Sequence, residues 1–187
     1  DDEFNIVVWE AVTLTLAQNA GIRVPEHRLE TVLGQSVLVT RRFDRDAGHR
    51  RIPFLSAMSM LSAHDHEQHS YLEMAYALAQ NGASPEEDMK ELWRRIVFTI
   101  MVSNTDDHLR NHGFLLSPKG WILSPAYDMN PVPNSDGLAL NISEVDNSLD
   151  LNLALEVAKY FRIKMKRAKV IMNEVQSVVR QWRSLAK

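Results

Sequence analysis

The sequence predicts an α+β domain that is mostly helical and carries a few small β-hairpins. Long segments repeat apolar residues at helical spacing, and short apolar runs on either side of turn residues are typical of hairpins. The chain has 187 residues, of which 45% are hydrophobic and 24% are charged. These values are ordinary for one globular domain with a substantial core, and the length is slightly short for two.

The N-terminal part predicts one helix followed by one hairpin. Apolar residues recur at close to helical spacing over residues 4–20, and Gly21 then provides a left-handed helix cap. Residues 29–33 and 35–43 are two strand-like runs that meet at Gly34, which indicates a hairpin. The expected order is therefore a helix, an extended connection and two short strands.

The next part predicts short helices joined by polar connections. Residues 44–49 form a charged turn, and residues 53–61 are apolar and predict a short helix. The histidine-rich residues 64–69 predict a polar loop. Residues 71–81 predict a helix that ends at Gly82.

A long core helix is predicted after Ser84. Serine is a capping residue, Pro85 suits the first helical position, and Glu86 and Glu87 suit the positive end of the helix dipole. The apolar positions that follow have the density of a buried helix. They are Met89, Leu92, Trp93, Ile96, Val97, Ile100 and Met101.

The C-terminal half predicts a second hairpin and two further helices. Residues 113–116 and 121–123 bracket the turn residues 117–120, which include a proline and a glycine. Residues 149–161 and 164–185 predict the two helices. These elements complete the α+β arrangement.

Polar residues interrupt the apolar pattern between the core helix and the second hairpin, over residues 103–112. Asp106 and Asn111 stand five residues apart there, and Asp128 follows the hairpin. Their oxygens are ligands that suit Mg²⁺, which takes few protein ligands and fills its remaining positions with phosphate and water. The catalytic loop of protein kinases has the same spacing between its Asp and its Asn. The segment therefore predicts an ATP-dependent phosphotransferase, although each residue alone is also typical of a turn.

Composition excludes several other classes of protein. The chain has no cysteine, which excludes a disulfide scaffold, a cysteine nucleophile and a zinc–thiolate site, and which suits a reducing cytoplasm. The net charge of -3 does not favour nucleic acid or an anionic membrane, and no apolar run is long enough to span a bilayer. The chain begins with Asp1 and with a helix almost at once, so we expect a piece of a longer protein.

Five motifs, in order along the chain, resemble those of the HipA-type serine/threonine kinase toxins of bacterial toxin–antitoxin modules. Residues 40–45 (Thr-Arg-Arg-Phe-Asp-Arg) resemble the family's hinge between the two lobes, and residues 52–58 and 69–73 resemble its following motifs. Residues 104–111 (Asn-Thr-Asp-Asp-His-Leu-Arg-Asn) resemble the catalytic loop, and residues 123–129 resemble the metal-binding segment. The resemblance covers nearly the whole chain.

The resemblance implies a role for each matching residue. Asp106 would be the catalytic base or would orient the acceptor hydroxyl, and His108 would lie in the catalytic loop near the phosphates of ATP. Asn111 and Asp128 would bind Mg²⁺. The backbone of the hinge would face adenine, and the hinge residues concerned are Arg41, Arg42 and Phe43. Arg41 stands where the family usually has a glutamate.

The resemblance also implies how the domain is organised. Residues 1–187 would be a protein-kinase-like C-terminal lobe with a hinge near residues 36–45. The phosphate-covering loop and the ATP-binding lysine of kinases find no match here, so we expect the N-terminal lobe to be largely absent. As this fragment alone, the kinase would bind nucleotide weakly and be impaired in catalysis.

The expected function is an ATP- and Mg²⁺-dependent protein serine/threonine kinase, cytoplasmic, acting as the toxin of a toxin–antitoxin module. Its partners would be a protein substrate with a Ser or Thr acceptor and a DNA-binding antitoxin, with no membrane contact. The alternative from another class is a non-catalytic or degenerate kinase-like module that binds an antitoxin or nucleic acid. A kinase of a small hydroxylated molecule is a third reading.

Two charged segments have both a functional and a structural interpretation. His64, His66 and His69 favour a solvated loop over a metal site, because their spacing fits no helix face. The C-terminal helix is strongly basic, which indicates either a solvated face or a contact with DNA or an acidic partner, and the net charge does not support direct DNA contact. Its basic residues are Arg162, Lys164, Lys166, Arg167, Lys169, Arg180, Arg183 and Lys187, against the single acid Glu174.

Overall fold

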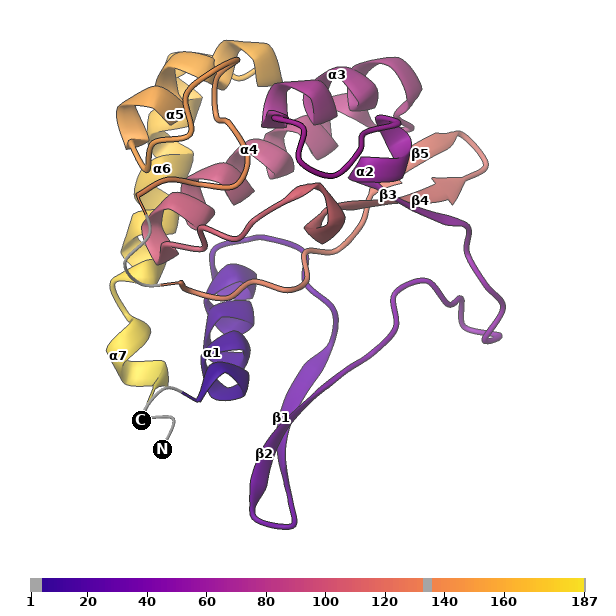
Figure 1. The fold of residues 1–187 in the computed structure, drawn as a ribbon, viewed down its shortest axis with the longest axis vertical. Coiled ribbons are helices and arrows are strands. Elements are labelled where there is room, and N and C mark those ends of the chain that lie inside the picture. The colour runs from indigo at the N-terminus through magenta and orange to yellow at the C-terminus, as the bar shows by residue number, and fades with distance from the viewer. Residues whose placement is uncertain (1–4, 133–135, 187) are drawn as a thin grey trace.

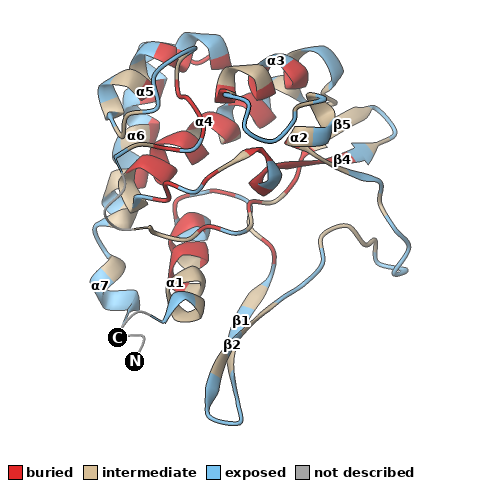
Figure 2. Cartoon of the chain, viewed as in Figure 1, coloured by how far each residue is buried: buried red, intermediate tan, exposed pale blue. Residues whose placement is uncertain are grey.

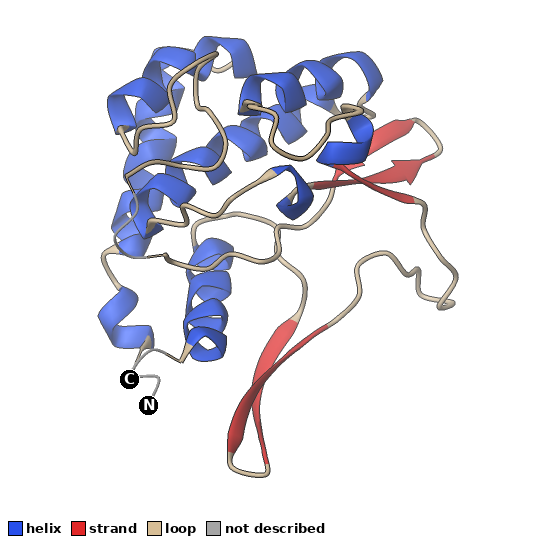
Figure 3. Ribbon diagram, in the orientation of Figure 1, coloured by secondary structure: helices blue, strands red, loops and turns tan. Residues whose placement is uncertain are grey.

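The computed structural model describes residues 5–132 and 136–186 as a helical body from which one long hairpin projects (Figures 1 and 3). The described helices are α1 (Ile6–Asn19), α2 (Ala57–Met60), α3 (Tyr71–Asn81), α4 (Pro85–Val102), α5 (Leu151–Val157), α6 (Met165–Val179) and α7 (Trp182–Leu185). Two 3₁₀ turns, η1 (Leu109–Asn111) and η2 (Ala158–Phe161), accompany them. The α+β prediction is confirmed, and Phe4, where the first predicted helix starts, lies outside the described residues.

The helix α4 forms the centre of the body and packs against α3, α5 and α6. Pro85 occupies its first turn together with three acidic residues, as the positive end of a helix dipole favours. Trp93 is fully buried and its indole N–H donates to the carbonyl of Ala154 on α5 at 2.8 Å. The predicted core helix is therefore confirmed, and it anchors the loop that follows it.

The N-terminal hairpin consists of β1 (His27–Val32) and β2 (Gln35–Thr40), paired antiparallel. Leu33 and Gly34 form its turn with φ of 51° and 81°, the left-handed conformation that two-residue hairpin turns require. We call residues 26–53, which comprise this hairpin and the loop after it, the arm. No residue of the arm is buried (Figure 2).

A small sheet joins β3 (Phe54–Ser56), β4 (Gly113–Ser117) and β5 (Gly120–Leu123) in that order. The predicted second hairpin is β4–β5, whereas residues 53–61 are helical only in α2, because residues 54–56 pair with β4 instead. At Gly113 an added Cβ would lie 2.1 Å from the ring of Phe54, so the close approach of β3 and β4 requires glycine. The sheet sets the direction in which the chain enters and leaves the polar segment.

The two predicted C-terminal helices are each divided. The first consists of α5 and η2, and the second breaks after α6 so that Trp182 on α7 packs against Trp9 on α1, with ring centroids 5.7 Å apart. On α6, Ile171 and Val175 are buried, whereas Val170 is 41% exposed. None of the helices within the described ranges is long and apolar enough to cross a membrane.

Candidate active site

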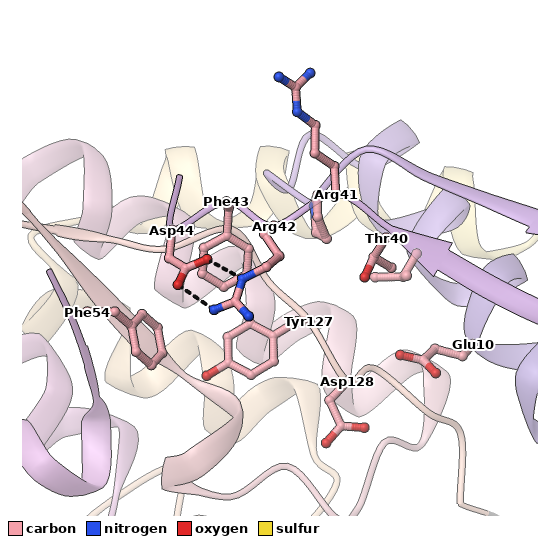
Figure 4. Close-up of a pocket in the computed structure, with 11 residues that line it drawn as sticks. Glu10, Thr40, Arg41, Arg42, Phe43, Asp44, Phe54, Tyr127 and Asp128 are labelled. Atoms are coloured by element: carbon pink, nitrogen blue, oxygen red, sulfur yellow. Dashed lines mark hydrogen bonds and ion pairs between the residues drawn. The ribbon is translucent and has the colours of Figure 1, made fainter. Parts of the chain in front are cut away.

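A cavity of about 480 Å³ lies where the arm meets the body (Figure 4). Its walls come from parts of the sequence that are far apart: the helix α1, the segment after β2, the strand β3 and the segment after β5. The residues that line it are Glu10, Leu14, Pro25, Thr40, Arg41, Arg42, Phe43, Asp44, Phe54, Tyr127 and Asp128. The fold therefore brings the predicted hinge residues and Asp128 to one cavity.

The side chains of the hinge arginines are held by local acids. Arg42 donates two hydrogen bonds to Asp44, at 2.8 and 2.6 Å, and Arg45 donates a third at 2.6 Å. The bond from Arg42 is the main reason why the pKa of Asp44 is lowered to about 2. These contacts fix the bend of the chain after β2.

Arg41 differs from its neighbours because its side chain points away from the cavity (Figure 4). Its guanidinium pairs with Glu26 at 3.3 Å, and its backbone N–H donates to the Glu26 carbonyl at 2.8 Å. Arg41 therefore extends the pairing of the hairpin, and it offers the cavity neither its charge nor its N–H. Besides the remaining atoms of Arg41, the hinge residues that line the cavity are Thr40, Arg42, Phe43 and Asp44.

Aromatic rings line one side of the cavity. Phe43 stacks on Tyr127, with centroids 5.5 Å apart and planes at 29°, and lies 6.0 Å from the ring of Phe54. Burial raises the pKa of Tyr127 to about 12, and its hydroxyl donates to the carbonyl of Arg110 at 2.7 Å. A cavity with such a wall suits a flat apolar group, and Tyr127 links it to the polar loop.

Two carboxylates stand at the other side of the cavity. Asp128 is exposed, has a φ of 55°, and accepts a hydrogen bond from the amide of Asn130 at 3.2 Å. Glu10 is half-buried on α1, and burial, followed by the negative charge of Asp128, raises the pKa of Glu10. The described residues offer Glu10 no cationic partner. The cavity therefore has an aromatic side and an acidic side.

The predicted catalytic loop begins where α4 ends at Ser103, whose φ of 54° turns the chain sharply. Asp106 is exposed, whereas Asn111 is buried in η1 and its amide donates to the backbone carbonyl of Asp106 at 3.4 Å. The backbone N–H groups of Val132 and Ala139 bond to the carbonyls of Ser103 and Thr105, each at 2.8 Å. The first three residues of the loop are therefore tied to the chain that follows β5.

Asp106, His108 and Asn111 do not line the cavity that contains Asp128. His108 lies instead in a smaller hollow of about 110 Å³ beneath the histidine-rich loop. An ion pair between Arg110 and Asp65 also connects the catalytic loop to the histidine-rich loop. The loop and the cavity are neighbours through the bond from Tyr127 to Arg110. The segments that carry the two sets of predicted residues are thus joined by this hydrogen bond.

The residue types of Asn111 and Asp128 suit Mg²⁺ better than a metal with a full protein cage. Asn111 and Asp128 together supply one carboxamide oxygen and one carboxylate, the kind and number of ligands that Mg²⁺ takes beside phosphate and water. Among residues 5–132 and 136–186, no three His, Cys, Asp or Glu residues gather as a metal cluster. His69 in the histidine-rich loop bonds instead to Glu73 at 2.8 Å and to Glu67 at 3.3 Å.

A buried polar cluster lies beneath the catalytic loop and was not predicted. Asp107 is 4% exposed and accepts hydrogen bonds from the hydroxyl of Tyr71 at 2.5 Å and from Nε2 of His112 at 3.0 Å. Burial disfavours the ionised form of Asp107, but the charge of His112 and these two bonds outweigh burial and lower its pKa. Burial, followed by the charge of Asp107, raises the pKa of Tyr71 well above its usual value.

Comparison with known proteins identifies the family of this chain. Residues 2–182 match the family of HipA-like C-terminal domains. A putative kinase of Haemophilus influenzae is 30% identical over 155 residues, and Toxin YjjJ of Escherichia coli is 25% identical over 154 residues. These alignments cover 70% and 80% of the chain but only 44% and 34% of the two relatives, so the chain spans less than half of their length.

Two solved structures share the fold. HipA of Shewanella oneidensis, solved with HipB and operator DNA, has a TM-score of 0.70 at 18% identity, covering 100% of this chain and 55% of that one. The proinflammatory kinase CtkA of Helicobacter pylori has a TM-score of 0.63 at 14% identity, covering 97% of this chain and 84% of that one. At these identities the structures establish a kinase-like fold.

Proposed function

The chain belongs to the family of HipA-like C-terminal domains, and we propose that it is the catalytic lobe of an ATP- and Mg²⁺-dependent protein serine/threonine kinase. One observation carries this proposal: the cavity between the hinge and Asp128 lies beside a loop that exposes Asp106 and holds Asn111. A nucleotide has an aromatic end and an anionic end. The cavity has an aromatic side and, at its other side, the carboxylate of Asp128, an oxygen ligand that suits a cation.

The hinge and the aromatic wall would bind the base of the nucleotide. Phe43 and Tyr127 present a stacked pair of rings, and the contacts of Asp44 hold the hinge in its bent form. Arg41 lines the cavity but would not bind the base through its guanidinium or its N–H, because both are engaged with Glu26. An aromatic wall with few polar groups is the usual composition of a nucleotide-sized site.

The catalytic loop would act on the acceptor hydroxyl. Asp106 is the exposed acid of the loop, so it would orient a serine or threonine hydroxyl and accept its proton. Asn111 and Asp128 would hold Mg²⁺, which supplies charge stabilisation to the transferring phosphoryl group. His108 would lie beside the phosphates. Its buried Nδ1 has no hydrogen-bond partner among the described residues.

Glu10 adds a residue to the proposed machinery. In protein kinases an acid on the helix that faces the nucleotide pairs with the phosphate-binding lysine. Glu10 lies on α1, faces the cavity and has no cation beside it among the described residues. We assign it the role of receiving that lysine.

The proposed biological role is that of a toxin paired with an antitoxin. Two similarities support it: one relative is named a toxin, and the HipA structure that shares the fold contains HipB and operator DNA. The exposed basic residues at the start of α6 offer a surface to an acidic partner or to a DNA backbone. They are Arg162, Lys164, Lys166, Arg167 and Lys169, of which Arg167 pairs with Glu174 at 3.2 Å.

The experiment measures Mg²⁺-dependent ATP turnover and autophosphorylation of the full-length protein beside Asp106→Ala and Asp128→Asn. We expect both substitutions to lower turnover by about 100-fold or more, while circular dichroism shows an intact fold. Glu156→Gln is the matched control, because Glu156 is exposed on α5 and does not line the cavity. We expect it to retain full turnover.

Nucleotide binding separates the alternatives. If the full-length protein neither binds nor hydrolyses ATP, the kinase proposal is wrong, and a non-catalytic module that binds an antitoxin or nucleic acid becomes the better account. If it phosphorylates small hydroxylated molecules but no protein, the proposed phosphotransferase activity is retained and the proposed protein substrate is wrong.

A further inference from the structure

We propose that Asp107 is the positioning residue of the catalytic loop: buried between α3, α4 and the start of β4, it holds Asp106 and Asn111 in place. The proposal rests on the proposed function for its catalytic consequence, but the contacts of Asp107 stand on geometry alone. Asp106 and Asp107 are adjacent acids with opposite environments, since Asp106 is exposed and Asp107 is 4% exposed. In this proposal, the anchored side chain of Asp107 fixes the backbone from which Asp106 projects outward.

Two side chains from separate parts of the sequence converge on Asp107. Tyr71 comes from the first turn of α3 and is fully buried, and His112 comes from the residue just before β4. Both donate to the same carboxylate oxygen of Asp107, and their rings meet edge to face with centroids 5.7 Å apart. A carboxylate held by two donors from separate elements cannot rotate without breaking a buried bond.

A buried arginine lies between this cluster and the other half of the site. Arg95 is 1% exposed on α4, pairs with Glu91, and donates to the carbonyl of Ser124 at 2.6 Å, while its positive charge helps to lower the pKa of Asp107. Ser124 directly follows β5 and stands four residues before Asp128. The same buried charge therefore acts on the catalytic loop and on the segment that carries the proposed metal ligand.

The position of Asp107 in the loop turns this anchoring into a catalytic effect. Asn111 bonds to the backbone carbonyl of Asp106, so a shift of Asp107 moves both residues together. A displacement of about 1 Å at a reacting group costs on the order of 100-fold in rate. Nucleotide binding would change little, because Asp107 and Tyr71 do not line the cavity.

The test is Tyr71→Phe in the full-length protein, which removes one hydroxyl and keeps the packed ring. We expect kcat to fall by about 10- to 100-fold with KM for ATP within about 2-fold of wild type. Amide hydrogen exchange of residues 104–111 should become at least about 10-fold faster. Tyr76→Phe is the matched control on the same helix, since the side chain of Tyr76 is 68% exposed.

Asp107→Asn provides a second variant of nearly the same volume, and it should reproduce the loss of kcat at unchanged KM. The proposal is overturned if Tyr71→Phe changes neither kcat nor exchange beyond Tyr76→Phe, or if kcat and KM change together. If the wild-type protein has no turnover, the proposed function fails. The exchange of residues 104–111 then still decides whether Asp107 anchors the loop.

Discussion

The arm and the body of this protein are built by different forces. No residue of the arm is buried, whereas α4 buries most of its length and the catalytic loop buries Asp107, Asn111 and His112 (Figure 2). The arm is shaped by a tight turn and by exposed charge pairs such as Arg42–Asp44. The body is shaped by packing and by buried polar contacts.

This difference assigns different tasks to the two sides of the site. Exposed ion pairs contribute about 0–1 kcal/mol each, so the hinge side is held weakly and can adjust to a ligand. Breaking a buried charged pair costs several kcal/mol, so the loop with Asp106 is held in advance of binding. In the proposed kinase, the chemistry that depends on geometry would lie on the rigid side, and the nucleotide base would bind on the adjustable side.

The largest effect is expected when a packed side chain is removed from the body. Trp93→Ala should lower the free energy of unfolding by about 3–5 kcal/mol, because it leaves a cavity in α4 and frees the Ala154 carbonyl. Leu33→Ala at the tip of the arm, where the side chain is 100% exposed, should change it by less than about 0.5 kcal/mol. Urea denaturation measures both, and similar losses would contradict the comparison.

A second test uses the pH dependence of the buried cluster. The pKa of Asp107 is lowered in the folded protein, so its ionisation stabilises the fold above the unfolded pKa, near pH 4, and this contribution is lost as the pH falls through the folded value. Asp107→Asn should therefore cost about 2–4 kcal/mol at pH 7. The difference from wild type should shrink below about pH 4. A constant difference at every pH would show that Asp107 acts without its charge.

The corresponding acid of the arm should behave more weakly. Asp44 has a pKa of about 2, so its pairs with Arg42 and Arg45 stabilise the hinge above about pH 4 and are lost as the pH falls toward 2. Asp44→Asn should lower stability at pH 7 by less than about 1 kcal/mol. Its main effect should be a higher KM for ATP at unchanged kcat. A fall in kcat at unchanged KM would contradict this expectation, because it would mean that Asp44 positions reacting groups and does not act in binding ATP.

The smallest expected effect is at Glu10, on the border of the two regions. Its pKa is raised in the folded protein, so its ionisation destabilises the fold as the pH rises above the usual pKa of a glutamate. Glu10→Gln should thus raise the melting temperature of residues 1–187 at pH 7 by about 1–3 °C, and leave it unchanged near pH 3. The same substitution should impair turnover of the full-length protein. A lower melting temperature would indicate that Glu10 already has a cationic partner.

Elements with local signals were predictable from the sequence, and elements with distant partners were not. The helices α3 and α4 were predicted because periodicity and end signals lie within each segment. The strand β3 was not, because three residues become a strand only by pairing with β4. The break between α6 and α7 depends likewise on the contact of Trp182 with Trp9 from the other end of the chain.

The candidate site divides in the same way. Asp106, Asn111 and Asp128 could be proposed from spacing and order, because a loop motif is local. The sequence cannot distinguish an outward acid from the inward acid beside it, and only the fold shows that Asp107 meets Tyr71. Glu10 has no local signal, since α1 reaches the cavity through tertiary packing. Whether these residues act as proposed remains a prediction for the experiments above.

The backbone of Asp128 has a consequence for natural and laboratory variation at that position. With φ at 55°, the residue adopts a conformation that asparagine, aspartate and glycine accept readily and that other residues adopt only with strain. Most substitutions there would disturb both the chain path and the proposed oxygen ligand, and the two effects could not be separated. Asparagine removes the charge but tolerates the backbone conformation, so, if Asp128 binds Mg²⁺ as proposed, a screen should find Asp128→Asn as the inactive variant that destabilises the fold least.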